Sequence, residues 1–398
     1  MIRVFAGAVD AEGVAVAEVV AVAGENETTN QGPGVRVFIY EFVTGGGCFL
    51  MPQWGRPSGS LLVEGLAMAR AVTADALSAG FDVMVTVDCR LDNPFAHPLP
   101  YRPGDNVTGT HLGNLLVEFV DSEVSHWERL ARLTRQCDFV MVIAPEIDGQ
   151  LERIVRRVKS DLSEAGGTLL SPLPDDVAWA ADKHLTQLRL RQLGRYYVEG
   201  VRREAGEDSH YAGPWPAVVK PLLGAGSWGV RRVERQVDLE TELSGITEPV
   251  RVEPFCPGTA ASIAMLLGPR RPVVLPPLRQ RFDPEGSFQY VGGERLGGDS
   301  LIERTEKMAR AVATLFVGAV GYIGVDVVLG DHVRGQEDRV IEVNPRLTTS
   351  YVGLRQIARE NLFGAIVLTA QGGAPRMTFS NQAIQFSADG TVASGSVS

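Results

Sequence analysis

Cysteine and long apolar runs are scarce in this chain of 398 residues. Its four cysteines lie far apart and form no CxxC pair, so we expect neither a zinc site nor a disulfide framework, and a reducing compartment fits. No apolar stretch is long enough to cross a bilayer, and no basic segment followed by an apolar run opens the sequence. We therefore expect a cytoplasmic protein without a membrane partner.

Positive charge is also in short supply. The formal net charge is −10, whereas a general nucleic-acid binder needs a basic face, so no nucleic-acid partner is expected. A nucleotide needs only a local basic pocket and stays compatible with this balance. Among the 38 basic residues, the only lysines are Lys159, Lys183, Lys220 and Lys307. A lysine kept in such a chain either serves a site that needs a compact ammonium or survives by chance.

The hydrophobic content of 44% and charged content of 22% are those of a globular protein with a sizeable core. After an N-terminal extension (1–34) without an assigned role, apolar strands predicted over 35–43, 81–88 and 139–144 alternate with helices predicted over 60–79, 122–136 and 151–165. This alternation predicts a parallel α/β domain over 35–170. Ligand sites are then expected where its strands end, near Glu41–Gly47, Asp88–Arg90 and Pro145–Asp148.

The rest of the chain is predicted to form a two-lobed α+β unit. The first lobe (171–249) contains a predicted helix over 180–193 and a strand over 217–221, followed by a glycine-bearing turn. The second lobe (250–372) is rich in strands, and 373–398 reads as a peripheral tail. The overall fold class expected is therefore α/β, with a parallel domain before the two lobes.

One candidate site lies at the end of the strand that reaches Lys220. The following turn contains Gly224, Gly226, Ser227, Trp228 and Gly229. Glycines let backbone N–H groups approach phosphate oxygens closely, and a lysine at a strand end holds an ammonium at a fixed depth. The lysine precedes the glycines and a strand follows, so this is not a Walker loop. The alternative is an ordinary hairpin with a surface lysine.

Two late strands carry acidic residues between apolar neighbours. Asp326 interrupts one strand, while Glu342 and Asn344 share a face of the next because they are two residues apart. Two carboxylates and an amide oxygen form a hard-oxygen set suited to Mg²⁺. Pro345 then ends the strand, and Arg346 is placed to meet a developing acyl phosphate with its planar fork. The alternative is a strand with a solvent-facing acidic side.

A third motif lies where the two predicted lobes meet. There Glu253 is expected to accept a hydrogen bond from an adenine amino group, with the backbone of Pro254 and Phe255 along the ring. The alternative is an interdomain strand with an exposed glutamate.

The order Lys183, Lys220 with its glycines, Glu253, Asp326 and then Glu342, Asn344 and Arg346 resembles that of the ATP-grasp superfamily over about 175–370. The resemblance implies a pre-ATP-grasp domain followed by the two lobes of an ATP-grasp domain. It also implies that both lysines and the glycine turn bind ATP, and that Asp326, Glu342 and Asn344 bind Mg²⁺, for which Mn²⁺ can substitute. Lys220 and Arg346 would be catalytic. Relatives often carry a ribose-binding acid where this chain has Ala260.

A narrower resemblance is carried by Phe38–Gly47, Ser60–Gly65 and Asn344–Ser350, which look like segments of the tyramine–glutamate ligases of methanofuran and methylofuran biosynthesis. It implies that the γ-carboxylate of L-glutamate is joined to the amine of tyramine, with release of ADP and phosphate. The partners would be a small amino acid and an amine, and ligases of this kind are often homodimers.

Substrate roles are less sharply defined. The candidates are Arg346, Thr348, Thr349 and Ser350 for the carboxylate, Glu41 and Asp88 for an amine or phenol, and Ser262 as a strand hydroxyl facing the site. Local capping is the alternative for Glu41 and Asp88. At the level of function, the alternatives are a ligase for another amino acid or dipeptide, and a sensor that binds ATP without ligation.

Overall fold

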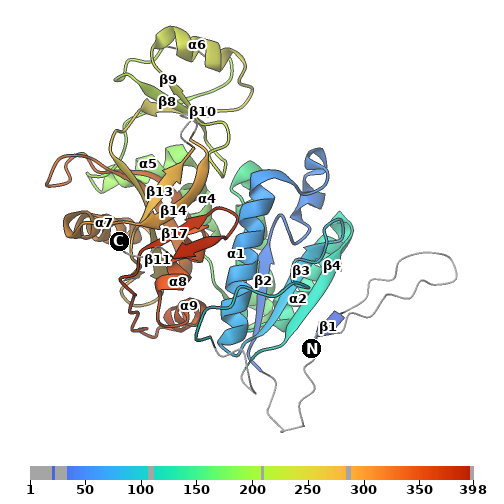
Figure 1. Cartoon of the computed structure of the whole chain (residues 1–398). Helices are drawn as coiled ribbons and strands as arrows, with labels where there is room; N and C mark the ends of the chain where they lie inside the picture. The colour runs from blue at the N-terminus through green and yellow to red at the C-terminus, as the bar shows by residue number, and fades with distance from the viewer. Residues whose placement is uncertain (1–19, 23–33, 106–111, 208–209, 284–287, 395–398) are drawn as a thin grey trace.

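The computed structural model describes residues 20–22, 34–105, 112–207, 210–283 and 288–394. Three sheets organise these residues into a first domain, a small lobe and a large lobe (Figure 1). No helix among them is both long enough and apolar enough to cross a membrane.

The first domain contains a six-stranded sheet in the order β1-β4-β3-β2-β5-β6. All neighbouring strands are parallel except β1, which pairs antiparallel with β4. The prediction of a parallel α/β domain is confirmed, although no strand was predicted at β4. The strands are β1 (Val20–Val22), β2 (Arg36–Glu41), β3 (Asp82–Asp88), β4 (Leu115–Val120), β5 (Phe139–Ile143) and β6 (Thr168–Leu169).

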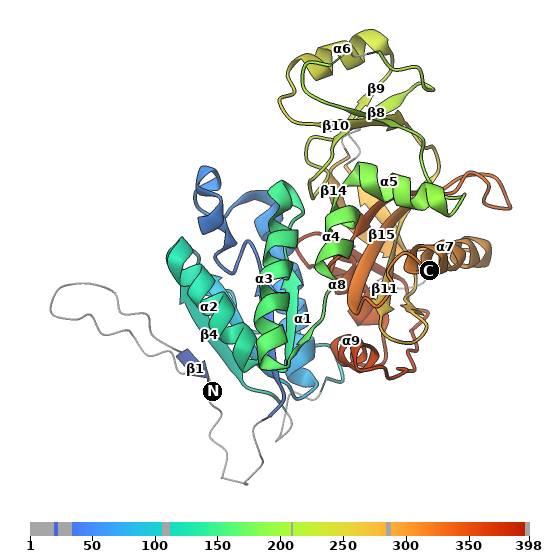
Figure 2. The same ribbon diagram turned by 180° about the vertical axis from the view of Figure 1, so that it is seen from behind.

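Helices cover both faces of this sheet. Successive side chains of a strand point to opposite faces. Val37 and Ile39 of β2 accordingly pack toward α1 (Gly59–Ser78), while Phe38 and Tyr40 join the core beneath α2 (Glu123–Gln136) and α3 (Gln150–Ala165). Figure 2 shows α2 and α3 on the face opposite to α1. All three helices were predicted to within one residue at each end.

The small lobe, at the top of Figure 1, is an antiparallel sheet in the order β7-β10-β8-β9, covered by α6. The strand β10 was grouped with the second lobe in our sequence prediction, but it pairs with β7 and β8 here. The elements are β7 (Val201–Arg203), β8 (Ala217–Pro221), β9 (Arg231–Val233), α6 (Gln236–Ser244) and β10 (Val250–Pro254).

The large lobe contains an antiparallel sheet in the order β16-β15-β11-β13-β14-β17-β18, with β12 paired to β11. Its last two strands come from 373–398, which was expected to be a peripheral tail. The strands are β11 (Thr259–Leu267), β12 (Val273–Val274), β13 (Leu278–Phe282), β14 (Tyr290–Arg295), β15 (Gly321–Leu329), β16 (Arg339–Asn344), β17 (Ile384–Ser387) and β18 (Val392–Ser394).

Two groups of helices sandwich this large sheet. On one face lie α4 (Pro174–Ala181), α5 (Lys183–Gln192) and α7 (Asp299–Ala313). The single helix predicted over 180–193 is therefore wrong: the chain breaks at Asp182, whose side chain accepts hydrogen bonds from the N–H groups of His184 and Leu185. An aspartate in this capping geometry starts a new helix, with Lys183 in its first turn.

On the other face, α8 (Ser350–Ile357) and α9 (Leu362–Ala370) pack against α1 of the first domain. Asp75 of α1 receives the guanidinium of Arg355 at 2.6 Å and the hydroxyl of Tyr351 at 2.6 Å, and all three side chains are buried. A single apolar core thus joins the first domain to the large lobe, which fixes α1 beside the large sheet.

Candidate active site

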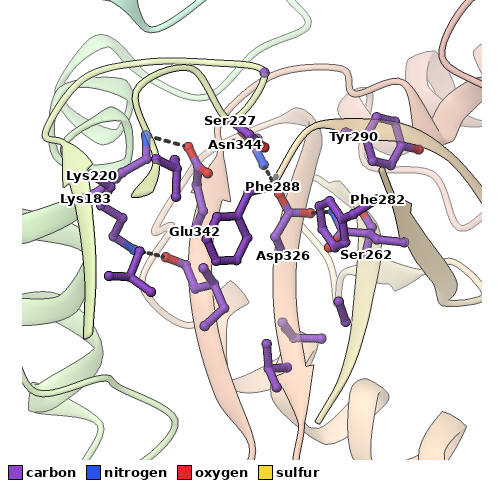
Figure 3. Close-up of a pocket in the computed structure, with 18 of the residues that line it drawn as sticks. Lys183, Lys220, Ser227, Ser262, Phe282, Phe288, Tyr290, Asp326, Glu342 and Asn344 are labelled. Carbon is purple, nitrogen blue, oxygen red and sulfur yellow. Dashed lines mark hydrogen bonds and ion pairs between the residues drawn. The ribbon is translucent and has the colours of Figure 1, made fainter. Parts of the chain in front are cut away.

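A cavity of about 480 Å³ is lined by the small lobe, the large sheet and one residue of α1. Figure 3 shows Lys183 and Lys220 on one side of it, Asp326 and Asn344 near its middle, and Tyr290 on the other side. Of the residues predicted to bind nucleotide or metal, Gly229 alone does not line it. The others do, namely Lys183, Lys220, Gly224, Gly226, Ser227, Trp228, Glu253, Pro254, Phe255, Asp326, Glu342 and Asn344.

Lys220 sits at the end of β8 within a buried network of charges. Its Nζ lies 2.5 Å from Oε1 of Glu253, whose Oε2 lies 2.6 Å from Nε of Arg251. The Arg251 guanidinium also donates to the carbonyl of Val198 and contacts Nδ1 of His184 at 2.8 Å. Two cations share one carboxylate here, so this wall of the cavity has an excess positive charge that suits an anion.

Glu253 was expected to accept a hydrogen bond from adenine. It lines the cavity, but both of its oxygens are held by Lys220 and Arg251, and only 3% of the residue is exposed. Its observed contacts orient Lys220. Pro254 and Phe255 lie at the same end of the cavity, and the Arg232 guanidinium stacks over the Phe255 ring at 4.5 Å. A flat apolar surface is thus present where a base could stack.

Lys183 ties the glycine turn to the acidic strand. Its Nζ forms an ion pair with Oε1 of Glu342 at 2.8 Å and donates to the carbonyl of Gly224 at 3.0 Å. Its backbone N–H donates to the carbonyl of Leu222 at 3.0 Å. Because Asp182 caps α5 directly before it, the helix start fixes the position of this lysine.

The turn between β8 and β9 adopts backbone conformations that favour glycine. Gly226 and Gly229 have φ of 65° and 72°, and a Cβ on Gly229 would come within 2.8 Å of Pro221. Ser227 also has a positive φ, 59°, which is uncommon for a residue with a side chain and often marks a functional position. Trp228 next to it is 69% exposed. The turn therefore brings the backbone of Gly226, together with Trp228, to the cavity.

Two carboxylates face each other across β15 and β16. Asp326 is the register partner of Glu342, and like charges placed directly opposite destabilise a sheet. The hydrogen-bond donors to Asp326 are neutral: Gln280 Nε2 at 2.9 Å, Asn344 Nδ2 at 3.1 Å and the Ser262 hydroxyl. Burial and then the Glu342 charge raise the pKa of Asp326 to about 7. A cation bound between Asp326 and Glu342 would relieve the repulsion between their carboxylates.

This donor set fits Mg²⁺. Within the described residues, no group of three His, Cys, Asp or Glu side chains is placed to share a metal ion, so an all-protein cage is not present there. Two carboxylates and an amide oxygen are instead what Mg²⁺ uses when phosphates and water complete its shell. In this structure, the charge of Glu342 is balanced by its ion pair with Lys183.

Arg346 follows β16 and lines the cavity, but its guanidinium is engaged by the first domain. Nε and Nη2 donate to the two oxygens of Glu146, each at 2.9 Å, and Nη1 donates to the carbonyl of Leu347 at 3.2 Å. Glu146 is 1% exposed and lies in the predicted strand-end range 145–148. Its role was not predicted, since nothing in the sequence pairs it with a residue two hundred positions away.

The cavity also contains the hydroxyl residues predicted for substrate. Ser262, Thr348, Thr349 and Ser350 all line it, and Thr349 Oγ1 donates to Oε2 of Glu64 at 3.0 Å. Glu64, from α1, was not predicted as a site residue. Glu64 lies on a partly exposed face of α1. The helical periodicity of the sequence does not show that another domain lies next to this face.

Glu41 and Asp88 do not line the cavity. Glu41 is buried and accepts hydrogen bonds from the backbone N–H groups of Val43 and Thr44, at 3.2 and 2.7 Å. Asp88 is buried and paired with Arg90 at 2.6 Å. Both arrangements are those expected of local capping at strand ends.

Aromatic side chains form a wall that the sequence did not indicate. Phe282 of β13 and Tyr290 of β14 have ring centroids 6.5 Å apart, and Phe288 lies 6.5 Å from Phe255. All four rings line the cavity. Phe255 was predicted at the site, whereas Phe282 and Tyr290 were missed because β13 and β14 were not predicted as strands.

Comparison with known proteins agrees with this arrangement. Residues 180–350 match the family model of the ATP-grasp domain. The chain carries an ATP-grasp domain. Residues 81–170 match the model of the pre-ATP-grasp 3 domain, as the predicted fold required. The motif order from Lys183 to Arg346 falls within the matched ATP-grasp segment, so the superfamily resemblance is confirmed.

Among curated proteins, the chain is 25% identical over 219 residues to the tyramine–L-glutamate ligase of Methanocaldococcus fervens. The match covers 55% of this chain and 62% of that ligase, less than two thirds of its length.

Two solved structures share the ATP-grasp fold. An ATP-grasp superfamily protein from Archaeoglobus fulgidus has a TM-score of 0.59 and 20% identity, covering 88% of this chain and 92% of that one. An ADP complex of N5-carboxyaminoimidazole ribonucleotide synthetase has a TM-score of 0.62 and 12% identity, covering 89% and 81%. At these identities the likeness establishes the fold.

Proposed function

We propose that this protein is an ATP-dependent carboxylate–amine ligase that works through an acyl phosphate. Its proposed substrates are the γ-carboxylate of L-glutamate and the amine of tyramine. The observation that carries the proposal is the meeting of Lys183, Lys220 and the Asp326–Glu342 pair in one cavity. A cation-rich wall beside a pair of repelling carboxylates in one cavity suits a metal-bound polyphosphate.

In the proposed complex, the adenine lies near Pro254 and Phe255, and the phosphates lie under the glycine turn. Lys220 is held in position by Glu253, and Lys183 by the carbonyl of Gly224. Asp326, Glu342 and Asn344 would hold Mg²⁺, which supplies positive charge to the phosphate oxygens.

The chemistry proceeds in two displacements. An oxygen of the substrate carboxylate attacks the γ-phosphorus, the bond to the β-phosphate oxygen breaks, and ADP leaves. The neutral amine nitrogen then attacks the carbonyl carbon of the acyl phosphate, the carbon–oxygen bond breaks, and phosphate leaves with the proton that the new amide nitrogen gives up. The protein contributes mainly position and charge, because phosphoryl transfer needs little covalent help.

Support for glutamate and tyramine comes from the cavity end that faces the first domain. Arg346 and the hydroxyls of Thr348, Thr349 and Ser350 offer donors for carboxylates there. In the same cavity, Phe282 and Tyr290 offer apolar ring faces to an aromatic amine. The tyramine–glutamate ligase that the chain resembles supports the same pairing.

The test is ADP release measured over a panel of amino acids crossed with amines, including glutamate with tyramine. We expect release that depends on both substrates, and mass spectrometry should detect the amide. Lys220→Ala and Glu342→Gln should each lower the rate by about 10²-fold or more, as loss of a phosphate or metal contact does.

Lys159→Ala is the matched control, because Lys159 is exposed on α3 and far from the cavity in the fold. Folding of each variant is checked by thermal unfolding. Activity with a different acid and amine would replace the substrate assignment and keep the reaction type. ATP binding without turnover across the whole panel would contradict the ligase proposal and favour a nucleotide sensor.

A further inference from the structure

We propose that Glu64, supplied by the pre-ATP-grasp domain, binds the ammonium of the amine substrate and accepts its proton before C–N bond formation. The proposal rests on the ligase function above and assigns one residue of this chain to the second half of that reaction. It makes the first domain a direct participant in the chemistry.

The position of Glu64 is the first reason. It projects from α1 into the cavity, where Thr349 Oγ1 donates to its Oε2 at 3.0 Å. Its other oxygen lies under the glycine turn, 3.7 Å from where a Cβ on Gly226 would stand. The turn is the proposed cover of the phosphates. A group at Glu64 is therefore next to the place where an acyl phosphate would form.

The charge balance is the second reason. Glu253 is paired with Lys220 and Arg251, and Glu342 with Lys183. Glu64 differs, because among the described residues no cation lies within 4.0 Å of it and it accepts a hydrogen bond from a hydroxyl instead. A carboxylate beside a phosphate site repels the phosphate unless a cation lies between them. The ammonium of an amine substrate supplies that cation.

The neighbours of Glu64 limit the alternatives. Arg346 is the nearby positive group, but two of its nitrogens are held by Glu146. Tyr290, on the far side of the cavity from the lysines (Figure 3), approaches from β14 and stays protonated, since burial raises its pKa. Burial also raises the pKa of Glu64, which makes it a better proton acceptor than an exposed glutamate.

The proposed step balances as follows. The substrate arrives as R–NH3⁺, and one proton passes from its nitrogen to a carboxylate oxygen of Glu64. The freed lone pair attacks the carbonyl carbon, the C–N bond forms and the bond to phosphate oxygen breaks. The second proton leaves with phosphate, and Glu64 returns its proton to solvent when the product departs.

The experiment separates the two halves of the reaction with hydroxylamine. Hydroxylamine is largely neutral at pH 7, so it attacks an acyl phosphate without an ammonium site or a base. The full-length wild type, Glu64→Gln and Glu64→Asp are incubated with ATP, Mg²⁺ and the acid substrate, once with hydroxylamine and once with the amine. Hydroxamate, amide and ADP are measured in each.

We expect Glu64→Gln to form hydroxamate within about twofold of wild type, because the first displacement is intact. Its amide formation should fall by about 10²-fold, the usual contribution of a general base. Glu64→Asp keeps the charge and should retain more amide formation than the glutamine variant. Glu128→Gln, an exposed change on α2, is the control and should match wild type in both assays.

Other outcomes overturn the proposal in recognisable ways. Loss of hydroxamate and amide together would place Glu64 on the acid substrate or on the nucleotide. Unchanged amide formation in Glu64→Gln would remove it from the reaction. If the wild type produces neither hydroxamate nor ADP with any acid, the ligase function itself fails, and that result is distinct from both.

Discussion

Two aspartates in this molecule, Asp75 and Asp326, differ in the charge of their neighbours. Asp75, between α1 and α8, is fully buried and receives a guanidinium and a phenol hydroxyl, each at 2.6 Å. Asp326, in the cavity, faces Glu342 across the sheet and accepts hydrogen bonds from neutral amide and hydroxyl donors. Asp75 has its countercharge in Arg355, whereas no basic side chain in the described part of the chain lies within 4.0 Å of Asp326. A carboxylate paired inside the protein suits a structural role, while one that faces a like charge in a cavity suits a ligand that completes the charge balance.

The largest expected effect comes from breaking the internally paired site. Asp75→Ala removes the 2.6 Å partner of the buried Arg355 and leaves it only the more distant Asp105, at 4.0 Å, which should lower the free energy of unfolding by about 3–5 kcal/mol. Urea unfolding measures it. Glu303→Ala, which removes an exposed ion pair with Lys307 on α7, is the control and should cost less than about 1 kcal/mol. A loss of similar size in both variants would show that the contact between α1 and α8 is not held by this network.

The cavity aspartate should behave in the reverse way. Asp326→Asn keeps the side-chain shape and removes the repulsion from Glu342, so thermal stability without ligands should not fall. Substrate-dependent ADP release should drop by about 10²–10³-fold, or about 3–4 kcal/mol, because a ligand of the metal is lost. An Asn variant that unfolds as readily as Asp75→Ala would erase the distinction between the two sites.

A smaller effect on activity is expected at the ion pair between Glu146 and Arg346, which is paired internally and also borders the cavity. Glu146 holds Arg346 in two hydrogen bonds and also joins the first domain to the cavity. Glu146→Gln should free the guanidinium to move and lower kcat by about tenfold, with little change in KM for ATP. Steady-state kinetics with ATP and with the acid varied in turn measure it. A change confined to KM for ATP would place Arg346 on the nucleotide.

The smallest effect is a pH dependence of stability. The pKa of Asp326 is raised from its ordinary value of 3.8 to about 7. The folded state therefore favours the protonated acid, and this contribution is fully present below about pH 4 and lost as pH rises through about 7. Without Mg²⁺, wild type should lose about 1 kcal/mol or more relative to Asp326→Asn between pH 5 and pH 8. Parallel curves for the two proteins, from urea unfolding at each pH, would contradict it.

Much of the site could be predicted because its residues interrupt strong local patterns. Lys220 ends an apolar strand, and Asp326 and Glu342 stand inside others, so periodicity alone marks them as unusual. The scarcity of lysine helped as well, since two of the four lysines line the cavity. Helices with clear periodicity, such as α1 and α3, were predicted almost to the residue.

The misses share a cause. The helix predicted over 180–193 breaks at Asp182, a helix-compatible residue whose capping role becomes visible only with its hydrogen bonds. The strands β13, β14 and β17 are short or carry polar residues on one face, and their pairing comes from distant segments. Because β13 and β14 were not predicted, Phe282 and Tyr290 on these strands were not predicted to line the cavity. Glu41 and Asp88 looked like ligand groups at strand ends, but their hydrogen bonds are local.

The order of chemical groups along the chain can be read from the sequence: a lysine before a glycine turn, a glutamate between the predicted lobes, and acids on two late strands. Such order follows from local pattern and is independent of how the domains pack. Tertiary structure alone decided the pairings across domains, Glu146 with Arg346 and Glu64 with Thr349, and the burial that raises the pKa of Asp326. The physical reason is that electrostatic environment depends on neighbours in space, and those neighbours lie up to 285 residues apart in sequence.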